Sequence, residues 1–160
     1  MNSGSIKLSG DKTLQSEIRR IGRTCFPSVY WSSIDTVINE YCPKHSIFAF
    51  SEEDTLQGFI LIRSDGLVDA SGLTVAPHHI EYLAVDPACA GKGIGGLMMK
   101  AALLSYNITQ QDKWLTCPYL LWLHVDTDNY IARRLYEKMG FRIWCSASDD
   151  FGYNGYIMVK

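Results

Sequence analysis

Six residues just past the middle of the chain, Gly91–Gly96, carry the pattern G-K-G-I-G-G. They stand between an apolar run typical of a buried strand and a segment whose apolar residues recur at helical spacing. Glycines allow a tight turn that points successive N–H groups into one concavity, and the start of a helix adds partial positive charge. The segment is therefore predicted to bind a pyrophosphate group.

The glycine pattern by itself leaves the ligand open. It matches the G-x-G-x-x-G of dinucleotide-binding folds, but the segment after the helix does not read as a second strand that ends in an acid. A P-loop requires Ser or Thr after its Gly-Lys pair, whereas Gly93 follows Lys92, so that interpretation fails. A glycine turn without any ligand is the remaining alternative.

Further segments decide between these alternatives because they occur in a fixed order around the loop. They are Val85–Pro87 before it, and Leu123–Val125, Asn129 and Leu135–Phe141 after it. Together these segments closely resemble the acetyl-CoA signature of the GNAT superfamily of N-acetyltransferases. The resemblance covers most of the chain, from about residue 46 to residue 160.

The resemblance implies an enzyme that uses acetyl-CoA, without a metal, to acetylate a primary amine directly. In the family an Arg or Gln that offers mainly its backbone N–H stands where this chain has Ala90, so alanine should be tolerated there. Strand backbone and an asparagine would contact the pantetheine, the glycine loop would hold the pyrophosphate, and a tyrosine would lie near the sulfur. The implied cofactor-binding residues are Leu83, Ala84, Val85, Ala90, Gly91, Lys92, Gly93, Ile94, Gly95, Gly96, Asn129 and Tyr136.

Direct transfer requires a base for the amine proton, an N–H group for the developing oxyanion and an acid for the thiolate. The resemblance implies Leu83 or its neighbour as the N–H donor and Tyr136 as the acid, although Tyr136 alone would read as a core aromatic. Three residues compete as the base, with Glu81 first, His124 second and His79 third. Glu81 and His79 share one face of a strand because alternate residues point the same way, and a water relay among all three is a further alternative.

The segment F-P-S-V-Y, with Phe26, Pro27 and Tyr30, resembles the F-P-x-x-Y loop of some eukaryotic N-terminal acetyltransferases. In those enzymes the loop packs on the first residue of the acceptor peptide, so a peptide or protein N-terminus is the expected acceptor. The alternatives are a small amine or polyamine and, from another class, a GNAT fold that binds acyl-CoA without catalysis. Acids that could attract a polyamine are Glu40, Glu52, Glu53 and Asp54.

These segments must be positioned by one α/β domain, residues 1–160. Helices are expected at 13–23, 33–41, 94–104 and 128–139, and strands at 46–51, 56–63, 79–85, 119–125, 141–147 and 153–160. The inner faces of the last two helices are expected to be Ile94, Leu97, Met98, Ala101 and Leu104, and Ile131, Ala132, Leu135 and Met139. The GNAT resemblance implies a mixed, mostly antiparallel central sheet of about seven strands flanked by about four helices.

The composition excludes several other classes of function. A net charge of −2 over 160 residues argues against broad binding to nucleic acid or an anionic membrane. No apolar run approaches the roughly 18–20 residues of a membrane-spanning helix. The first residues lack the apolar centre of a signal peptide, and the five cysteines are spread singly, so a cytoplasmic protein with reduced thiols is expected.

Overall fold

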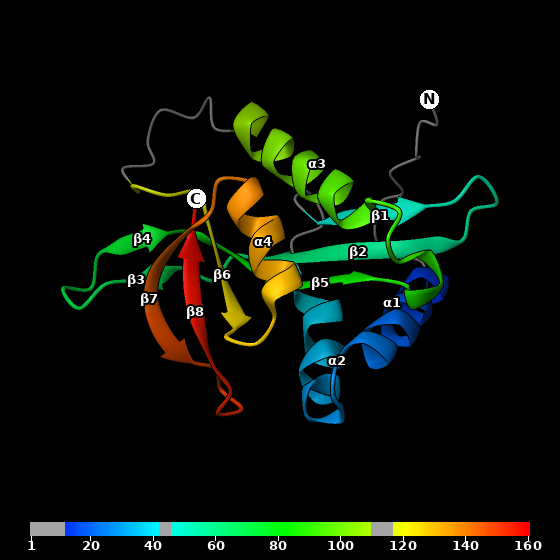
Figure 1. Ribbon diagram of the computed structural model, residues 1–160, viewed down its shortest axis with the longest axis horizontal. Coiled ribbons are helices and arrows are strands. Elements are labelled where there is room, and N and C mark those ends of the chain that lie inside the picture. Colours follow the sequence, from blue (N-terminus) through cyan, green and yellow to red (C-terminus); the bar gives the residue numbers. More distant parts are fainter. Residues whose placement is uncertain (1–11, 42–45, 110–116) are drawn as a thin grey trace.

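The structure is a computed structural model that describes residues 12–41, 46–109 and 117–160 (Figure 1). Its elements, in chain order, are α1 (Lys12–Cys25), the 3-10 turn η1 (Ser28–Tyr30), α2 (Trp31–Glu40), β1 (Ile47–Phe50), β2 (Leu56–Arg63), β3 (Leu67–Val68), β4 (Thr74–Ala76), β5 (His78–Val85), the 3-10 turn η2 (Pro87–Cys89), α3 (Ile94–Thr109), β6 (Leu121–Asp126), α4 (Tyr130–Lys138), β7 (Arg142–Ser148) and β8 (Asn154–Val159).

Six strands form the central sheet in the order β1-β2-β5-β6-β8-β7, and all neighbours are antiparallel except β5 and β6. The predicted mixed, mostly antiparallel α/β fold is confirmed, with one strand fewer in this sheet than expected. A separate two-stranded sheet, β3–β4, lies where the sequence indicated only a loop. Strands of two and three residues are too short to display a period-two pattern, which is why they were missed.

The helices cover both faces of the sheet, with α1 and α2 on one side and α3 and α4 on the other (Figure 1). Strand β2 shows how this layering is encoded. Its side chains alternate, so that Phe59 and Leu61 join the core beneath α1 and α2, whereas Ile60 and Ile62 join the core beneath α3 and α4. Because both faces are buried, the strand reads as a continuous apolar run.

The sheet is split between its two parallel strands. Strands β5 and β6 pair at only two positions, His78 with Leu121 and His79 with Trp122. By contrast, β5 pairs with β2 along its length, from Gly58–Val85 to Arg63–His79. Beyond His79, the β5 edge that faces β6 therefore has no strand partner among the described residues, and a gap opens between the strands.

The inner face predicted for α3 is correct at Ile94 and Met98 but wrong at its other three positions. The residues that pack under it are Met98, Met99 and Ala102, whereas Leu97 and Leu104 are 65% and 60% exposed. Helix α3 is apolar almost all round, so no broad polar face marks its solvent side and apolar spacing alone cannot select the buried one.

The inner face predicted for α4 is largely correct, with one error. Ala132, Leu135 and Met139 pack against the core, but Ile131 is 87% exposed and Tyr136 is the buried residue of this helix. A four-residue step from Ala132 leads to Tyr136, which places these two on one side of the helix. Ile131 lies about 100° around the axis from Ala132, which turns it away from the core.

The four described cysteines, Cys25, Cys89, Cys117 and Cys145, are unpaired thiols, and Cys42 lies outside the described residues. Within the described ranges, no helix has the length and hydrophobicity needed to cross a membrane.

Candidate active site

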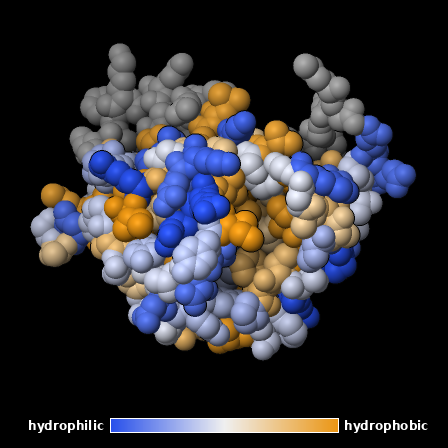
Figure 2. Space-filling view, viewed as in Figure 1, coloured by the Kyte–Doolittle hydropathy of each residue, from blue (hydrophilic) through white to orange (hydrophobic). Residues whose placement is uncertain are grey.

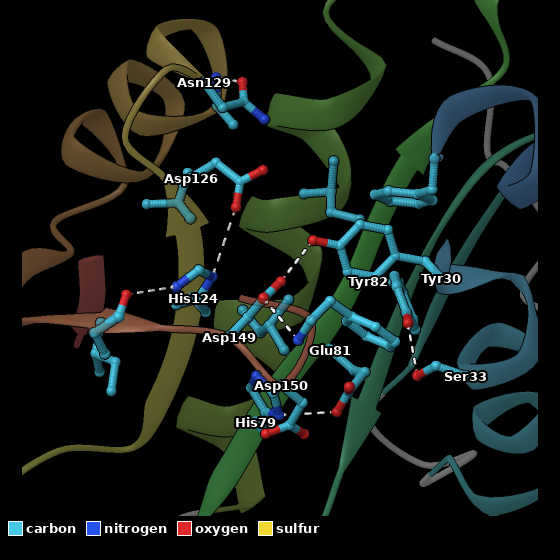
Figure 3. A pocket seen from close by; sticks show the side chains of 18 of the residues that line it. Tyr30, Ser33, His79, Glu81, Tyr82, His124, Asp126, Asn129, Asp149 and Asp150 are labelled. Carbon is cyan, nitrogen blue, oxygen red and sulfur yellow. Dashed lines mark hydrogen bonds and ion pairs between the residues drawn. The ribbon is translucent and has the colours of Figure 1, made fainter. Parts of the chain in front are cut away.

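A cavity of about 480 Å³ lies at the split between β5 and β6. Its walls come from the α1–α2 turn, β5, β6, α4 and the β7–β8 loop (Figure 3). The space-filling view shows this face hollowed between α4 and α2, with hydrophobic residues around the hollow (Figure 2). The cavity brings together all the predicted catalytic and acceptor-binding side chains, which are Phe26, Pro27, Tyr30, His79, Glu81, His124 and Tyr136.

Pro27 shapes the α1–α2 turn on the acceptor side of the cavity. Its ring fixes φ near −54°, which starts a single 3-10 turn instead of continuing α1, and α2 then begins two residues earlier than predicted. Phe26 packs edge-on against Tyr82 of β5 with ring centres 5.1 Å apart, and the indole N–H of Trp31 donates to the Phe26 carbonyl over 3.1 Å. The predicted F-P-S-V-Y loop is therefore held against the strand that carries two of the candidate bases.

Glu81, the first candidate base, is an ion-paired carboxylate that is only 18% exposed. One of its oxygens, Oε2, lies 2.9 Å from His79 Nδ1 and 3.5 Å from Arg63 Nη1. Burial alone would raise the pKa of Glu81, but His79 and Arg63 stabilise the carboxylate more strongly and hold that pKa below its ordinary value. A low pKa makes Glu81 a weak proton acceptor on its own. It also keeps Glu81 ionised, so that a negative charge lies beside the His79 ring.

His79, the third candidate base, lies at the apex of the split. Its ring stacks on Trp122 of β6 at 3.6 Å with the planes 2° apart, and the Trp122 indole N–H donates to the Asp65 carbonyl over 2.7 Å. Its buried Nδ1 lies 2.9 Å from Glu81 Oε2, but the two groups are not aligned for an N–H···O hydrogen bond. The ring is thus held by its stack on Trp122, with Glu81 as its nearest charged neighbour.

His124, the second candidate base, is held by contacts along β6 and β8. Its Nε2 lies 3.1 Å from the Ala147 carbonyl, and its Nδ1 lies 3.9 Å from a carboxylate oxygen of Asp126. Gly155 makes room for the ring, since a Cβ there would lie 2.5 Å from it. If Nε2 carries the proton that the carbonyl accepts, Nδ1 keeps a lone pair toward Asp126. Burial raises the pKa of Asp126. His124 lowers that pKa, but by less than burial raises it.

Asp149 and Asp150 belong to the cavity but were missed in the sequence, where D-D-F-G-Y reads only as a turn between two strands. Asp149 Oδ1 accepts the backbone N–H groups of Phe151 and Tyr153, each over 2.9 Å, and Oδ2 accepts the Tyr30 hydroxyl over 2.5 Å. Burial opposes ionisation of Asp149, but these three donors outweigh it and lower its pKa. Burial and the carboxylate raise the pKa of Tyr30, so both partners keep their ordinary charges at neutral pH.

The charge of the cavity is markedly one-sided. Four carboxylates and two histidines line it, and the described lining contains no lysine or arginine. Arg63 compensates Glu81 from outside the lining, which leaves Asp126, Asp149 and Asp150 to set the local potential. Such a cavity concentrates cations, including the ammonium form of an amine acceptor.

Tyr136, the predicted acid, lies on the wall that α4 contributes. It is 8% exposed and packs beside Phe141 with ring centres 6.0 Å apart. Burial raises the pKa of Tyr136 to about 12, so its hydroxyl remains protonated at neutral pH. Tyr136 is thus a neutral hydroxyl on the cavity wall, able to donate a hydrogen bond or a proton to a sulfur atom that gains negative charge as it departs.

The glycine loop lies where α3 begins and has the conformation that a phosphate cradle requires. Gly91 and Gly93 both have φ of +77°, in the left-handed region that favours glycine, and no atom lies within 4 Å of a Cβ built on either. Lys92 between them is exposed, Ala90 ends η2 in an extended conformation, and Ile94 is the first residue of α3. The open loop and the helix start fit a pyrophosphate.

Gly95 and Gly96 have a different role from the loop glycines. A Cβ on Gly95 would lie 3.6 Å from Leu135 and one on Gly96 3.8 Å from it, so both lie where α3 approaches α4. Asn129, predicted to contact the pantetheine, lines the cavity but also caps α4, because its side-chain oxygen accepts the Ala132 N–H over 3.1 Å. Its amide NH₂ is therefore the group that remains for a ligand.

The β5 residues predicted to run along the pantetheine have three different environments. Leu83 lines the cavity, and the Ala84 side chain is buried on the α1–α2 side while its backbone registers with Phe59. The Val85 carbonyl accepts the Cys25 thiol over 3.3 Å, so this carbonyl is already engaged. The fit to an extended pantetheine is therefore strongest along the part of the β5 edge nearest Leu83.

A split sheet whose gap meets a glycine loop at a helix start defines an acyl-CoA-dependent transferase, and comparisons with known proteins agree. The family model described as "Acetyltransferase (GNAT) family" matches residues 16–141, and the chain belongs to this family. It is an acetyl-CoA-dependent N-acetyltransferase, as predicted.

Individual relatives are distant in sequence. A curated relative, the peptidyl-lysine N-acetyltransferase YjaB of Salmonella typhimurium, is 24% identical over 127 residues, which cover 78% of this chain and 70% of YjaB. Ard1 from Thermoplasma volcanium is 24% identical with a TM-score of 0.71, covering 99% of this chain and 97% of its own. Arabidopsis thaliana Naa50, solved with the bisubstrate analogue CoA-Ac-MVNAL, is 21% identical with a TM-score of 0.65, covering 96% and 97%. Because these identities are below 25%, the likeness to the solved structures shows a shared fold and nothing more specific.

Proposed function

We propose that the enzyme transfers acetyl to the primary amine of a peptide or protein, with a free N-terminus as the preferred acceptor. The observation that carries this proposal is the position of Phe26, Pro27 and Tyr30 on the wall of the same cavity as Glu81 and His79. An aromatic wall that faces candidate bases suits a residue whose amine must be deprotonated while its side chain is packed. YjaB is named for peptidyl-lysine and Naa50 was solved with a peptide analogue, which makes peptide amines the first class to test.

The reaction would follow from the residues around the cavity. Acetyl-CoA supplies an activated acetyl thioester. The acidic lining attracts the ammonium group, and the His79–Glu81 pair takes one proton from it, with His124 as the second candidate. The amine nitrogen would form the new C–N bond and release its second proton, while the backbone near Leu83 stabilises the developing negative oxygen. The Tyr136 hydroxyl would protonate the sulfur as the C–S bond breaks, and the second amine proton balances the proton that Tyr136 gives up.

The base is proposed as a pair because the two side chains lie in contact and have complementary roles in this geometry. Glu81 has a lowered pKa, so it holds a proton poorly, but its carboxylate lies 2.9 Å from His79 Nδ1 and places a negative charge beside any proton that the ring takes up. His79 then presents its other nitrogen as the proton acceptor. The sequence ranked Glu81 ahead of His79 as the base, whereas this proposal gives the proton-accepting role to His79.

A small cationic amine is the second candidate acceptor, favoured by the acidic lining. Asp126, Asp149 and Asp150 lie in the cavity without a lysine or arginine among its described lining residues. The acids that the sequence suggested for this purpose do not line it, and Glu40 is instead paired with Arg63 at 2.9 Å.

An acceptor screen tests the proposal. Thiol release from acetyl-CoA is followed with peptides of varied first residue, with N-terminally blocked peptides that contain lysine, and with spermidine. We expect turnover with free N-termini, with mass spectrometry placing the acetyl group on the α-nitrogen. Turnover with spermidine alone would replace the first candidate by the second, and turnover with the blocked peptides alone would move the acceptor to lysine side chains.

A further inference from the structure

Two segments that are far apart in the chain meet at the acceptor side of the cavity. Tyr30, at the end of η1, donates its hydroxyl to Asp149 of the β7–β8 loop over 2.5 Å, although 119 residues separate them. The Tyr30 ring also packs edge-on against Phe151 at 4.6 Å and stacks on Tyr153 at 5.7 Å. Figure 3 shows the Tyr30 side chain pointing at the Asp149 carboxylate, and we call this contact the clasp.

The clasp is a built connection between the two segments. The Phe151 and Tyr153 N–H groups fix Asp149 Oδ1, which leaves Oδ2 aimed at Tyr30. A hydroxyl bound to a carboxylate at this distance is a charge-assisted bond, about twice as strong as a neutral one. Two aromatic contacts hold the Tyr30 ring in the position that this bond requires.

The clasp lies away from the end of the cavity that is suited to the cofactor. Leu83, Asn129 and Tyr136 line that end, whereas Tyr30 and Asp149 come from the turn and loop around the other. In Figure 3, Asn129 lies at one end of the drawn cavity and Asp150 at the other. An acceptor that reaches the cavity from the end opposite the cofactor would pass the α1–α2 turn and the β7–β8 loop.

A closed clasp leaves no passage for a chain between the Tyr30 hydroxyl and the Asp149 carboxylate. Polypeptide strands need about 4.8 Å between neighbouring backbones even when they are hydrogen-bonded, and a 2.5 Å contact admits no chain between its two oxygens. A short acceptor can occupy the cavity beneath the closed clasp. A longer chain that leaves the cavity at this point must separate Tyr30 from Asp149.

We propose that the Tyr30–Asp149 clasp determines specificity by length, favouring short acceptors over extended chains. The proposal rests on the proposed transfer to amines, and it names a selection within that class. An acceptor that opens the clasp loses the charge-assisted bond, and so reaches the transition state less readily than a short acceptor with the same first residue.

The test compares a single amino-acid amide with a ten-residue peptide that begins with the same residue. Tyr30→Phe removes the hydroxyl and keeps the ring contacts. We expect the ratio of kcat/KM for the long acceptor to that for the short one to rise on the order of tenfold, the worth of one hydrogen bond to a charged group. Asp149→Asn, which retains an oxygen for the two loop N–H groups, should move the ratio in the same direction.

Tyr153→Phe is the matched control, because Tyr153 contacts Asp149 through its backbone and Tyr30 through its ring only. The control should leave the ratio as in the wild type. A ratio that is unchanged or lower in both clasp variants overturns the proposal, as does an equal rise in the control. If the wild-type enzyme acetylates neither acceptor, the proposed function fails, and the dissociation constants of the two acceptors for the same variants still test the clasp.

Discussion

The two ends of the cavity are built from different parts of the chain. The end that we assign to the cofactor consists of main chain: the β5 edge without a strand partner among the described residues, the glycine loop with left-handed Gly91 and Gly93, and the start of α3. The acceptor end uses side chains, in which Tyr30 meets Asp149 and Glu81 meets His79. A main-chain site tolerates changes of side chain but not of backbone conformation, whereas a side-chain site is altered by single substitutions. The acceptor end is thus the part that can change without disturbing the cofactor site.

The largest effect is expected at the acceptor end, from the proposed base. Replacing Glu81 and His79 together by glutamine should lower kcat by about 10²–10⁴-fold, the usual contribution of general base catalysis. The single variants distinguish the two residues. His79→Gln should lower kcat as much as the double substitution does, whereas Glu81→Gln should lower kcat by a smaller factor. Steady-state kinetics over a range of pH measures both. A larger loss in Glu81→Gln than in His79→Gln would return the role of base to Glu81.

Tyr136 is the one side chain at the cofactor end that should matter greatly. Tyr136→Phe removes a hydroxyl that burial keeps protonated, so kcat should fall by about 10²-fold, while acetyl-CoA binding measured by calorimetry stays unchanged. Equal losses in turnover and affinity would indicate a structural tyrosine. Equal kcat values would remove it from the chemistry.

Gly93 tests the main-chain character of the cofactor end. Gly93→Val forces a β-branched residue into a left-handed conformation, at a cost of about 1–3 kcal/mol, so KM for acetyl-CoA should rise about tenfold. Gly96→Ala is the control, because its Cβ would meet Leu135 at an ordinary 3.8 Å. Similar effects of the two substitutions would contradict a role for the left-handed backbone.

Arg63 gives the smallest effect, a shift in pH dependence. Arg63→Met removes a cation 3.5 Å from Glu81, so the pKa of Glu81 should rise and the acidic limb of kcat/KM should move to higher pH by about one unit. The same depressed pKa means that ionised Glu81 stabilises the fold above its ordinary pKa, and that this contribution is lost as pH falls through the folded value. The variant should therefore lose less stability on acidification.

Arg19→Met is the control for that experiment. Arg19 forms a 2.9 Å pair with Asp35, and neither residue lines the cavity. It should leave the acidic limb in place. An acidic limb that does not respond to Arg63→Met would mean that the titration of the Glu81–His79 pair does not limit the rate.

The contrast between the two ends also explains what the sequence could predict. The cofactor end is predictable from one continuous segment, because Val85–Gly96 contains a strand end, a turn and a helix start. The acceptor end depends on tertiary contacts, and nothing near Tyr30 in the sequence indicates that Asp149 lies against it. Among the elements, periodicity identified every long helix and central strand, but it did not select the buried face of α3, whose surface is apolar nearly all round.

The two-rung pairing of β5 with β6 has a consequence for the lifetime of the protein. If acetyl-CoA binds along the β5 edge, as we propose, its extended pantetheine arm would fill the position of a missing strand. A ligand at a hundred times its dissociation constant stabilises a folded protein by about 2.7 kcal/mol, and the benefit falls as the ligand is depleted. The abundance of the enzyme should then follow the supply of acetyl-CoA, through resistance to unfolding and proteolysis, independently of any change in its synthesis.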